Sequence, residues 1–341
     1  MKSIKLILVK FVLWIEVSCI AACSSIGAIN PPATISPVST STSPVAIMPT
    51  SLPFTGKIVF IGFDKISDNN RVYVMTATGG ELTDISPPNL LSIEDLSWSP
   101  DGQYIAFDAF KNGAIQIFKM KLIDSNLAQL TFGEKDSYLP SWSPDGERIM
   151  FISSSQDILG NNDRPVQQIY TMKSDGAEVH HLIVATKAEN TPMSGSYRND
   201  GFISVSEPIT RHSYVNYIVS SDGVIQEQFP EFVTDFFPVW SPDNKFVLLS
   251  TLRTDCSGIV IMKADDSKST CLIIGKKATT PLVYAGAASW SPDGNYIIFS
   301  ANIENNNGIG NIYVMKPDES ELTRLTYLSE DVGGAVWSPE P

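Results

Sequence analysis

Histidine and catalytic motifs are scarce in this sequence. Its 341 residues include three histidines, His180, His181 and His212. The local patterns of serine hydrolases, zinc peptidases and nucleotide enzymes (Gly-x-Ser-x-Gly, His-Glu-x-x-His and glycine-rich phosphate loops) are missing. We therefore expect no catalytic residue and no enzyme activity. The alternative is an extracytoplasmic hydrolase or lyase acting at the channel mouth of the fold inferred below, with His212 as the candidate chemical residue.

Positively charged residues are fewer than negatively charged ones. The chain carries 24 Lys and Arg against 37 Asp and Glu, a formal net charge of -13 at pH 7. Because nucleic acid is polyanionic, this balance argues against it as a partner. No stretch follows the Asp-x-Asp-x-Asp-Gly spacing of a calcium loop, so we expect no metal and no cofactor, although loops rich in Asn and Asp leave calcium open.

An apolar stretch with lysines before it lies at the N-terminus. Residues 6–20 are mostly apolar, and the segment ends Ile20-Ala21-Ala22-Cys23. This pattern resembles a bacterial lipobox, which predicts a lipoprotein signal peptide at 1–22 and lipidation of Cys23. An ordinary secretory signal and a retained membrane anchor are the alternatives. We expect the mature protein in the cell envelope, extracytoplasmic and lipid-anchored to a membrane.

The segment after Cys23 has no charge at all. Residues 24–55 contain no Asp, Glu, Lys or Arg and are dominated by Ser, Thr and Pro. Such a composition cannot bury enough apolar area to fold. We expect residues 23–55 to form a disordered tether.

The sequence does contain a repeated motif, Trp-Ser-Pro-Asp-Gly, whose copies recur at steps of 43 to 55 residues. Three copies are complete, and the others are partial. The copies begin at Trp98, Trp142, Tyr197, Trp240, Trp290 and Trp337. Proline presets the backbone for a tight turn and glycine accepts a left-handed conformation, so each phrase ends a strand. A period of this length is typical of a four-stranded propeller blade.

Each phrase is followed by an apolar run of strand length, such as 104–107, and then by a third strand. A second turn and a short segment near Leu-Thr complete the unit. Five of the six third strands carry a methionine at the same point, namely Met75, Met120, Met172, Met262 and Met315. The tryptophans, which recur at one blade position, should pack between neighbouring sheets.

The two ends of the array complement each other. Residues 56–60 read as a second strand without a first, and residues 335–339 read as a first strand with nothing after it. If the C-terminal strand completes the first unit, residues 56–341 close into an all-β, six-bladed β-propeller of four-stranded blades without an unpaired edge. An open solenoid is the alternative.

These phrases resemble the TolB-type (WD40-like or PD40) propeller repeat, in which Trp-Ser-Pro-Asp-Gly and an Ile-Tyr-x-Met strand recur in each blade. The resemblance covers essentially all of 56–341. It implies the propeller fold and no single function, because related blades occur in scaffolds, in peptidases and in lipoproteins.

Two cysteines could form a disulfide once Cys19 leaves with the signal and Cys23 is lipidated. Alignment of the repeats places Val260 opposite Cys271, so Cys256 lies four residues, or about 13 Å, further along the strand. We therefore expect Cys256 and Cys271 not to be bonded.

Binding sites are expected on one face of the ring. In antiparallel blades, the connections between blades share a face with the loops between second and third strands, here the long segments 64–71, 153–167 and 302–311. Acidic residues precede most inner strands on that face: Glu94, Asp136, Glu189, Asp235 and Asp331. We expect them to ring the channel mouth and bind a cation or a basic segment; the alternative is that they cap turns or stay solvated.

Together these patterns predict a membrane-anchored, non-enzymatic binding or scaffolding module. The expected partner is a protein, a peptide or an envelope glycan, and we expect a monomer.

Overall fold

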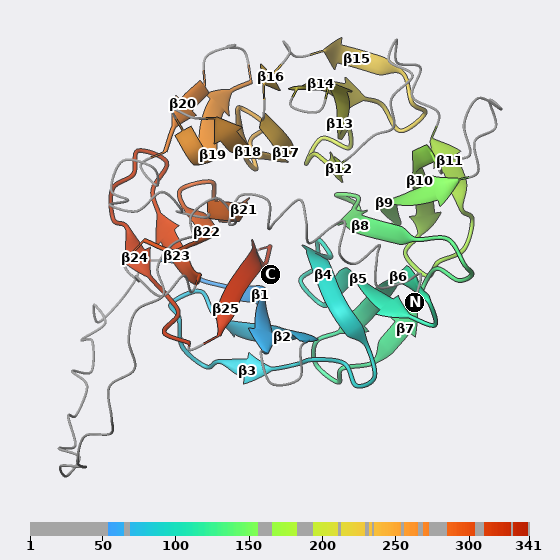
Figure 1. Cartoon of the computed structure of the whole chain (residues 1–341), viewed down its shortest axis with the longest axis horizontal. Helices are drawn as coiled ribbons and strands as arrows, with labels where there is room; N and C mark the ends of the chain where they lie inside the picture. Colours follow the sequence, from blue (N-terminus) through green and yellow to red (C-terminus); the bar gives the residue numbers. More distant parts are fainter. Residues whose placement is uncertain are drawn as a thin grey trace, which may run out of the picture. The chain divides into compact units, whose positions relative to one another are not determined.

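The repeats form six antiparallel sheets in the computed structural model (Figure 1). The structure describes residues 54–64, 69–155, 166–182, 194–210, 213–228, 232–233, 235–253, 256–264, 269–272, 285–303, 310–328 and 330–339. Within these ranges no helix is long and apolar enough to cross a membrane.

Each sheet is one blade, numbered along the chain and given from the centre of the ring outward. Blade 1 contains β25 (Asp331–Trp337), β1 (Lys57–Asp64), β2 (Asn69–Thr76) and β3 (Thr83–Asp84). Blade 2 contains β4 (Leu91–Trp98), β5 (Tyr104–Lys111), β6 (Ala114–Lys121) and β7 (Leu127–Gln129). Blade 3 contains β8 (Ser137–Trp142), β9 (Arg148–Ser155), β10 (Val166–Lys173) and β11 (His180–Leu182).

The second half of the ring repeats this order with one addition. Blade 4 contains β12 (Ser194–Tyr197), β13 (Ile203–Thr210), β14 (Ser213–Val219) and β15 (Ile225–Gln228), and β16 (Phe232–Val233) also pairs with β14. Blade 5 contains β17 (Asp235–Trp240), β18 (Phe246–Arg253), β19 (Cys256–Lys263) and β20 (Ser269–Cys271). Blade 6 contains β21 (Ala285–Trp290), β22 (Ile297–Ala301), β23 (Asn311–Met315) and β24 (Thr323–Arg324).

The first strand of every blade lies nearest the centre of the ring (Figure 1). Each of these inner strands contacts the inner strand of the next blade, and β21 contacts β25, which completes the circle. The predicted fold, an all-β six-bladed propeller of four-stranded sheets, is therefore confirmed.

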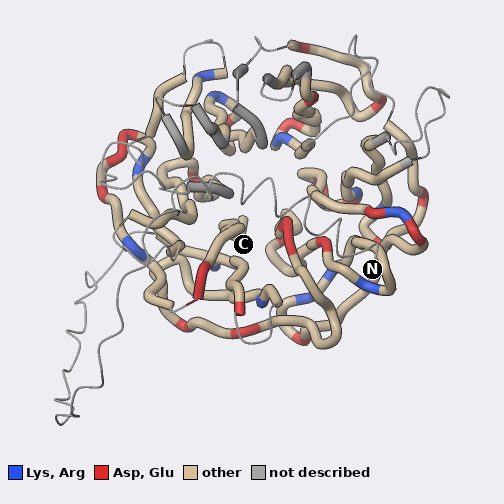
Figure 2. The backbone as a smooth tube through the Cα atoms, in the orientation of Figure 1, with Lys and Arg blue, Asp and Glu red and all other residues tan. Residues whose placement is uncertain are grey.

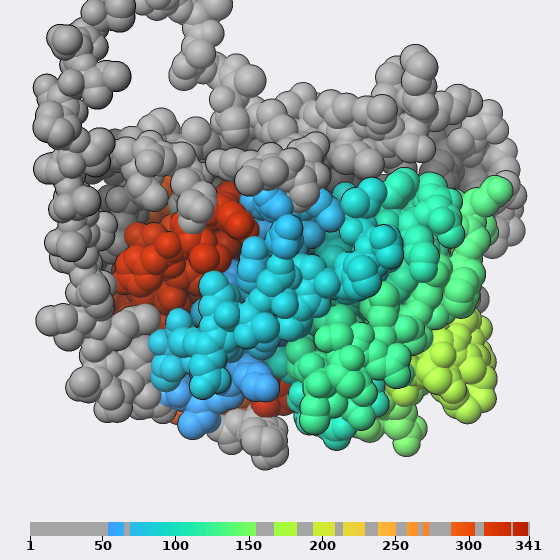
Figure 3. Space-filling model, turned by 90° about the horizontal axis from the view of Figure 1, so that it is seen from below, coloured from blue at the N-terminus to red at the C-terminus, as the bar shows by residue number. Residues whose placement is uncertain are grey.

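The ring closes by pairing the two ends of the propeller. In blade 1, β25 is antiparallel to β1, with Ile58 opposite Trp337 and Val59 opposite Val336. Figure 3 shows the N-terminal residues of the propeller, in blue, packed directly against C-terminal residues, in red. The compact unit starts at Phe54, slightly before the predicted boundary, and the Phe54 ring packs edge-on against the Trp337 ring at 5.5 Å between centroids.

The tryptophans join neighbouring blades, as expected. The Trp98 indole Nε1 of blade 2 donates a hydrogen bond to the Val336 carbonyl oxygen of blade 1 at 3.1 Å. Trp290 of blade 6 makes the equivalent bond to Val239 of blade 5, also at 3.1 Å. Both acceptors directly precede the tryptophan of their own blade, so the same interaction recurs at these two seams.

The Ser-Pro-Asp-Gly turn is held by its own side chains. The Gly102 N–H donates to the Ser99 carbonyl oxygen at 2.9 Å, and the Ser99 hydroxyl donates to Asp101 Oδ1 at 2.5 Å. Gly102 has a φ of 66°, the left-handed value that the sequence predicts. Asn244, which replaces this glycine in blade 5, adopts a φ of 58°, so the incomplete copy of the motif forms the same turn.

The core lies between the blades and is built from the second and third strands. The predicted methionine position has one register throughout, for example Met120 opposite Ile105 and Met315 opposite Ile297. Phe107 and Phe118 of blade 2 are fully buried and stack at 5.8 Å. Burying side chains of this size contributes about 1.5–3 kcal/mol each.

One expectation about the cysteines is wrong. The register is right, because Val260 pairs with Cys271. Cys271 is nevertheless disulfide-bonded, and its partner sulfur is not among the described side chains.

We predict that deleting residues 331–341, which removes β25, abolishes cooperative folding. The deletion exposes the edge of β1 and removes the Val336 acceptor of Trp98. Solubility and thermal unfolding followed by circular dichroism measure the effect, with deletion of residues 340–341 alone as the control. Unchanged melting of the longer deletion would contradict the closed ring.

We also predict that the turn aspartates make stability depend on acid. The Ser143 hydroxyl and then the Glu147 N–H hold the pKa of Asp145 below its ordinary value of about 3.9. The resulting stabilisation is present above the unfolded-state pKa and is lost as pH falls through the folded-state pKa. Asp145→Asn should therefore lower the Tm at pH 7 and flatten its fall between about pH 5 and pH 3, as thermal melts across this range will show. An equal slope in both proteins would contradict this origin.

Candidate functional site

The antiparallel order gives the propeller two different faces. The turn face carries the turns that follow first and third strands, such as 99–103 and 122–126 in blade 2. The connection face carries the loops that follow second strands, such as 112–113, and the connections between blades, such as 130–136. Asp and Glu are spread around the described part of the ring (Figure 2).

Two of the predicted acids perform the same structural task on the connection face. Asp136, just before β8, accepts a hydrogen bond from the Ile115 N–H through Oδ1 at 2.8 Å. Asp331, the first residue of β25, accepts one from the Gly310 N–H through Oδ1 at 2.6 Å. In both cases the carboxylate ties the start of an inner strand to the beginning of the third strand of the preceding blade, at Ile115 within β6 and at Gly310 directly before β23. These bonds join two blades, which is neither the expected ring of free carboxylates nor the capping of a turn.

At the equivalent junction between blades 1 and 2, the side-chain amide of Asn69 takes the place of the carboxylate. Asn69 accepts from the Ser92 N–H at 2.8 Å and donates to the Leu90 carbonyl oxygen at 3.2 Å. Glu94 is not the counterpart of Asp136, because it lies further along β4. In the strand register its backbone is opposite Asp108 of β5. Glu94 is half-buried.

The other predicted site residues lie wholly or partly outside the described part of the structure. The side chain of Asp235, at the start of β17, and all of Glu189 lie outside the described part of the structure, as does Cys23. The three long loops are described only at their ends.

A cluster of acids that the sequence analysis missed lies near Tyr138 of β8. The Tyr138 side chain is 6% exposed, and burial, followed by the charges of Asp136, Asp95 and Asp108, raises its pKa. These carboxylates come from the connection to blade 3, from β4 and from β5. Asp108 is 1% exposed and stands inside the apolar run Tyr-Ile-Ala-Phe-Asp-Ala-Phe, a signal that the sequence contained.

The cluster does not form a metal site. Among the described residues, no group of three or more His, Cys, Asp and Glu side chains is placed to hold a metal ion. His180 and His181 lie on β11, the outermost strand of blade 3, as predicted, and burial lowers the pKa of His181. His212 is outside the described residues.

Two exposed aromatic side chains lie on the connection face, whereas exposed aliphatic side chains such as Ile123 and Val224 lie on the turn face. Phe132 is 75% exposed and Tyr327 is 57% exposed, at equivalent positions after a Leu-Thr pair. The preceding threonine holds the chain: Thr131 Oγ1 accepts from the Ile117 N–H at 2.8 Å, and Thr326 Oγ1 accepts from the Ile312 N–H at 2.9 Å. The aromatic ring is therefore presented to solvent from an anchored backbone.

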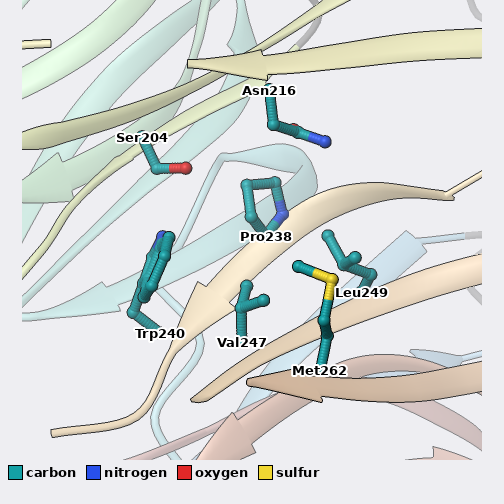
Figure 4. A pocket seen from close by; sticks show the side chains of 7 residues that line it. All are labelled: Ser204, Asn216, Pro238, Trp240, Val247, Leu249 and Met262. Atoms are coloured by element: carbon teal, nitrogen blue, oxygen red, sulfur yellow. The ribbon is translucent and has the colours of Figure 1, made fainter. Parts of the chain in front are cut away.

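A small cavity lies elsewhere, inside the ring between blades 4 and 5 (Figure 4). Ser204 and Asn216 of blade 4 line it together with apolar side chains of blade 5. Its volume is about 10 Å³, too small for a metabolite. It is therefore no candidate for a substrate site.

Six sheets closed by the C-terminal strand are the architecture of a known family. Residues 38–232, more than half of the chain, match the TolB beta propeller domain, PD40. The chain belongs to this family. The solved TolB of Acinetobacter baumannii has a TM-score of 0.66 to this propeller at 18% identity, covering 84% of this chain and 67% of that one. An identity this low shows the shared fold and nothing of activity.

Two curated relatives match parts of this chain. The uncharacterized protein Atu1656 of Agrobacterium fabrum is 26% identical over 104 residues, which are 30% of this chain and 36% of that protein. The uncharacterized peptidase YuxL of Bacillus subtilis is 27% identical over 166 residues, which are 47% of this chain and 22% of that protein. The chain thus spans well under two thirds of the length of either relative.

We predict that Asp136→Ala lowers the free energy of unfolding by about 1.5 kcal/mol, because the Ile115 N–H loses a charged acceptor. Asp136→Asn keeps an oxygen in place and should cost less than about 0.5 kcal/mol. Denaturant unfolding of both variants measures the difference. Equal stability of the two variants would show that this hydrogen bond does not fasten the blades.

Proposed function

We propose that this TolB-type propeller is a non-enzymatic binding module whose connection face engages a basic segment of a protein or peptide. The observation that carries the proposal is the repeated pairing of an exposed aromatic ring with acidic side chains. Phe132 precedes Asp136 by four residues, and Tyr327 precedes Glu330 and Asp331 by three and four.

The acids supply long-range attraction for a basic partner. Among the described residues, Asp136, Glu330 and Asp331 make no ion pair, so their charges are not compensated by a neighbouring cation. The chain as a whole is acidic. Uncompensated charges of one sign steer a partner of opposite sign and favour association at low ionic strength.

The aromatic rings supply contact area. Aromatic side chains are enriched at the centres of protein interfaces, where they are buried against the partner. Tyr327 is also held in place, because the Arg324 guanidinium lies 4.4 Å from its ring centre. A ring that is already ordered loses less conformational entropy on binding. Exposed rings also suit an envelope glycan, but the acidic neighbours favour a basic segment.

The proposal includes attachment to a membrane. Lipidation of Cys23 and the uncharged Ser/Thr/Pro tether would hold the propeller outside the cytoplasm and near a membrane surface. This part rests on the sequence pattern, because residues 1–53 lie outside the described residues.

An extracytoplasmic hydrolase or lyase is the second candidate. Its support is the name of one relative, the uncharacterized peptidase YuxL, of which the match spans 22%. Most of that protein therefore lies outside the match. Activity of the full chain on peptide, ester and glycoside panels that is lost in His212→Ala would favour this candidate.

We predict that three substitutions on the connection face, Asp136→Asn, Glu330→Gln and Asp331→Asn, weaken capture of a partner from solubilised envelopes. Three charges at about 0.5 kcal/mol each correspond to about a tenfold loss of affinity. Capture with the full chain as bait, at low and at physiological salt, measures the loss, and Phe132→Ser should add to it.

The matched control changes three acids at turns of the opposite face, Glu81→Gln, Glu147→Gln and Glu319→Gln. The two triple variants have the same net charge, so a specific surface affects capture in one variant and general acidity affects both. A partner that is captured equally by both variants, or a captured glycan without basic groups, would contradict the proposed basic segment.

A further inference from the structure

Blade 4 departs from the other blades at two buried positions. Ile203 pairs with Val219 just as Ile105 pairs with Met120, which aligns the second and third strands of the blades residue by residue. In this alignment Ser204 stands where the other blades have Val59, Ala106, Met150, Leu248 and Ile298. Asn216 stands where they have Val72, Ile117, Ile169, Ile259 and Ile312.

These two polar side chains are buried. Ser204 is 0% exposed and Asn216 is 3% exposed. Both line the cavity of about 10 Å³ that blade 5 covers with apolar side chains, among them Pro238, Trp240 and Met262 (Figure 4). The volume is the space open to the centre of a water molecule, so it suits one water and nothing larger.

Each of the two residues keeps a polar atom without a partner. Ser204 Oγ and Asn216 Nδ2 have no hydrogen-bond partner among the described residues. The other amide atom, Asn216 Oδ1, accepts from the Ser206 hydroxyl. Exchanging the amide oxygen and nitrogen would only move the unpaired position to the other atom. Buried polar atoms without partners are costly, and ordered water is the usual means by which proteins satisfy them.

We propose that this cavity is a binding site for one buried water molecule, held between Ser204 Oγ of β13 and the amide of Asn216 of β14. A water can accept from the amide nitrogen and either donate to or accept from the hydroxyl, so it satisfies both groups at once. The water replaces the aliphatic side chains that fill this position in the other blades. Blade 4 is thus packed against blade 5 through a hydrated patch in an otherwise apolar seam.

The sign of one stability change distinguishes a hydrated cavity from a dry one. In a hydrated cavity, Ser204→Ala removes a hydrogen bond to the water, and we expect the Tm to fall by about 2 °C. In a dry cavity the same change removes a buried hydroxyl without a partner, and the Tm should rise or stay unchanged. Thermal unfolding of the full chain gives the answer.

Ser194 provides the matched control. It is 4% exposed, its Oγ has no partner among the described residues, and it does not line the cavity. Ser194→Ala should therefore not lower the Tm. A fall of the same size in both variants would mean that any loss of a buried serine is destabilising, and would overturn the inference.

A second measurement detects the water itself. Relaxation dispersion of oxygen-17 water counts long-lived internal waters, and the count should fall by one in Ser204→Val combined with Asn216→Ile, the aliphatic types of the other blades. A crystal structure of the unmodified chain should show one density peak between the two side chains. An unchanged count, or a cavity without density, would overturn the proposal.

Discussion

The pairing of β25 with β1 is the interaction on which the rest of the propeller depends. Val336 opposes Val59 in this pair and also accepts the Trp98 hydrogen bond from blade 2. The Ser338 N–H donates to the Lys57 carbonyl oxygen, and Ser338 Oγ accepts from the Lys57 N–H. One strand thus completes blade 1 and joins it to the next blade. A ring needs every seam, so the loss of this one would open the structure at an unpaired edge.

Repetition explains why so much of the fold could be predicted from the sequence. Five of the six third strands carry a methionine at the same position, and the pairing of Val260 with Cys271 followed from this methionine and the turn after it. The Trp-Ser-Pro-Asp-Gly phrase predicted the turn because proline and glycine act locally. The disulfide state of Cys271 was not predictable in this way, and neither was β16, since both depend on local geometry that no other blade repeats.

The candidate site was less predictable because it depends on contacts between blades. The positions of Asp136 and Asp331 before inner strands were visible, but their bonds to Ile115 and Gly310 join segments 21 residues apart. Asp108 of blade 2 approaches Tyr138 of blade 3 only because the two blades pack at a particular angle to each other. A buried polar residue within an apolar repeat, as at Asp108 or Ser204, is the signal that could have identified these positions.

The acids of the two faces bond to different groups, those of the turn face to their own turn and those of the connection face to a neighbouring blade. On the turn face, aspartates such as Asp101 and Asp293 bond to the serine and the backbone of their own turn. These acids are committed to the turn itself. On the connection face, Asp136 and Asp331 each use one oxygen to fasten two blades. A carboxylate has two oxygens. Among the described residues the second oxygen of Asp101 is unused as well. What supports the proposed role of Asp136 and Asp331 is therefore their position next to the exposed rings of Phe132 and Tyr327, and not a spare oxygen.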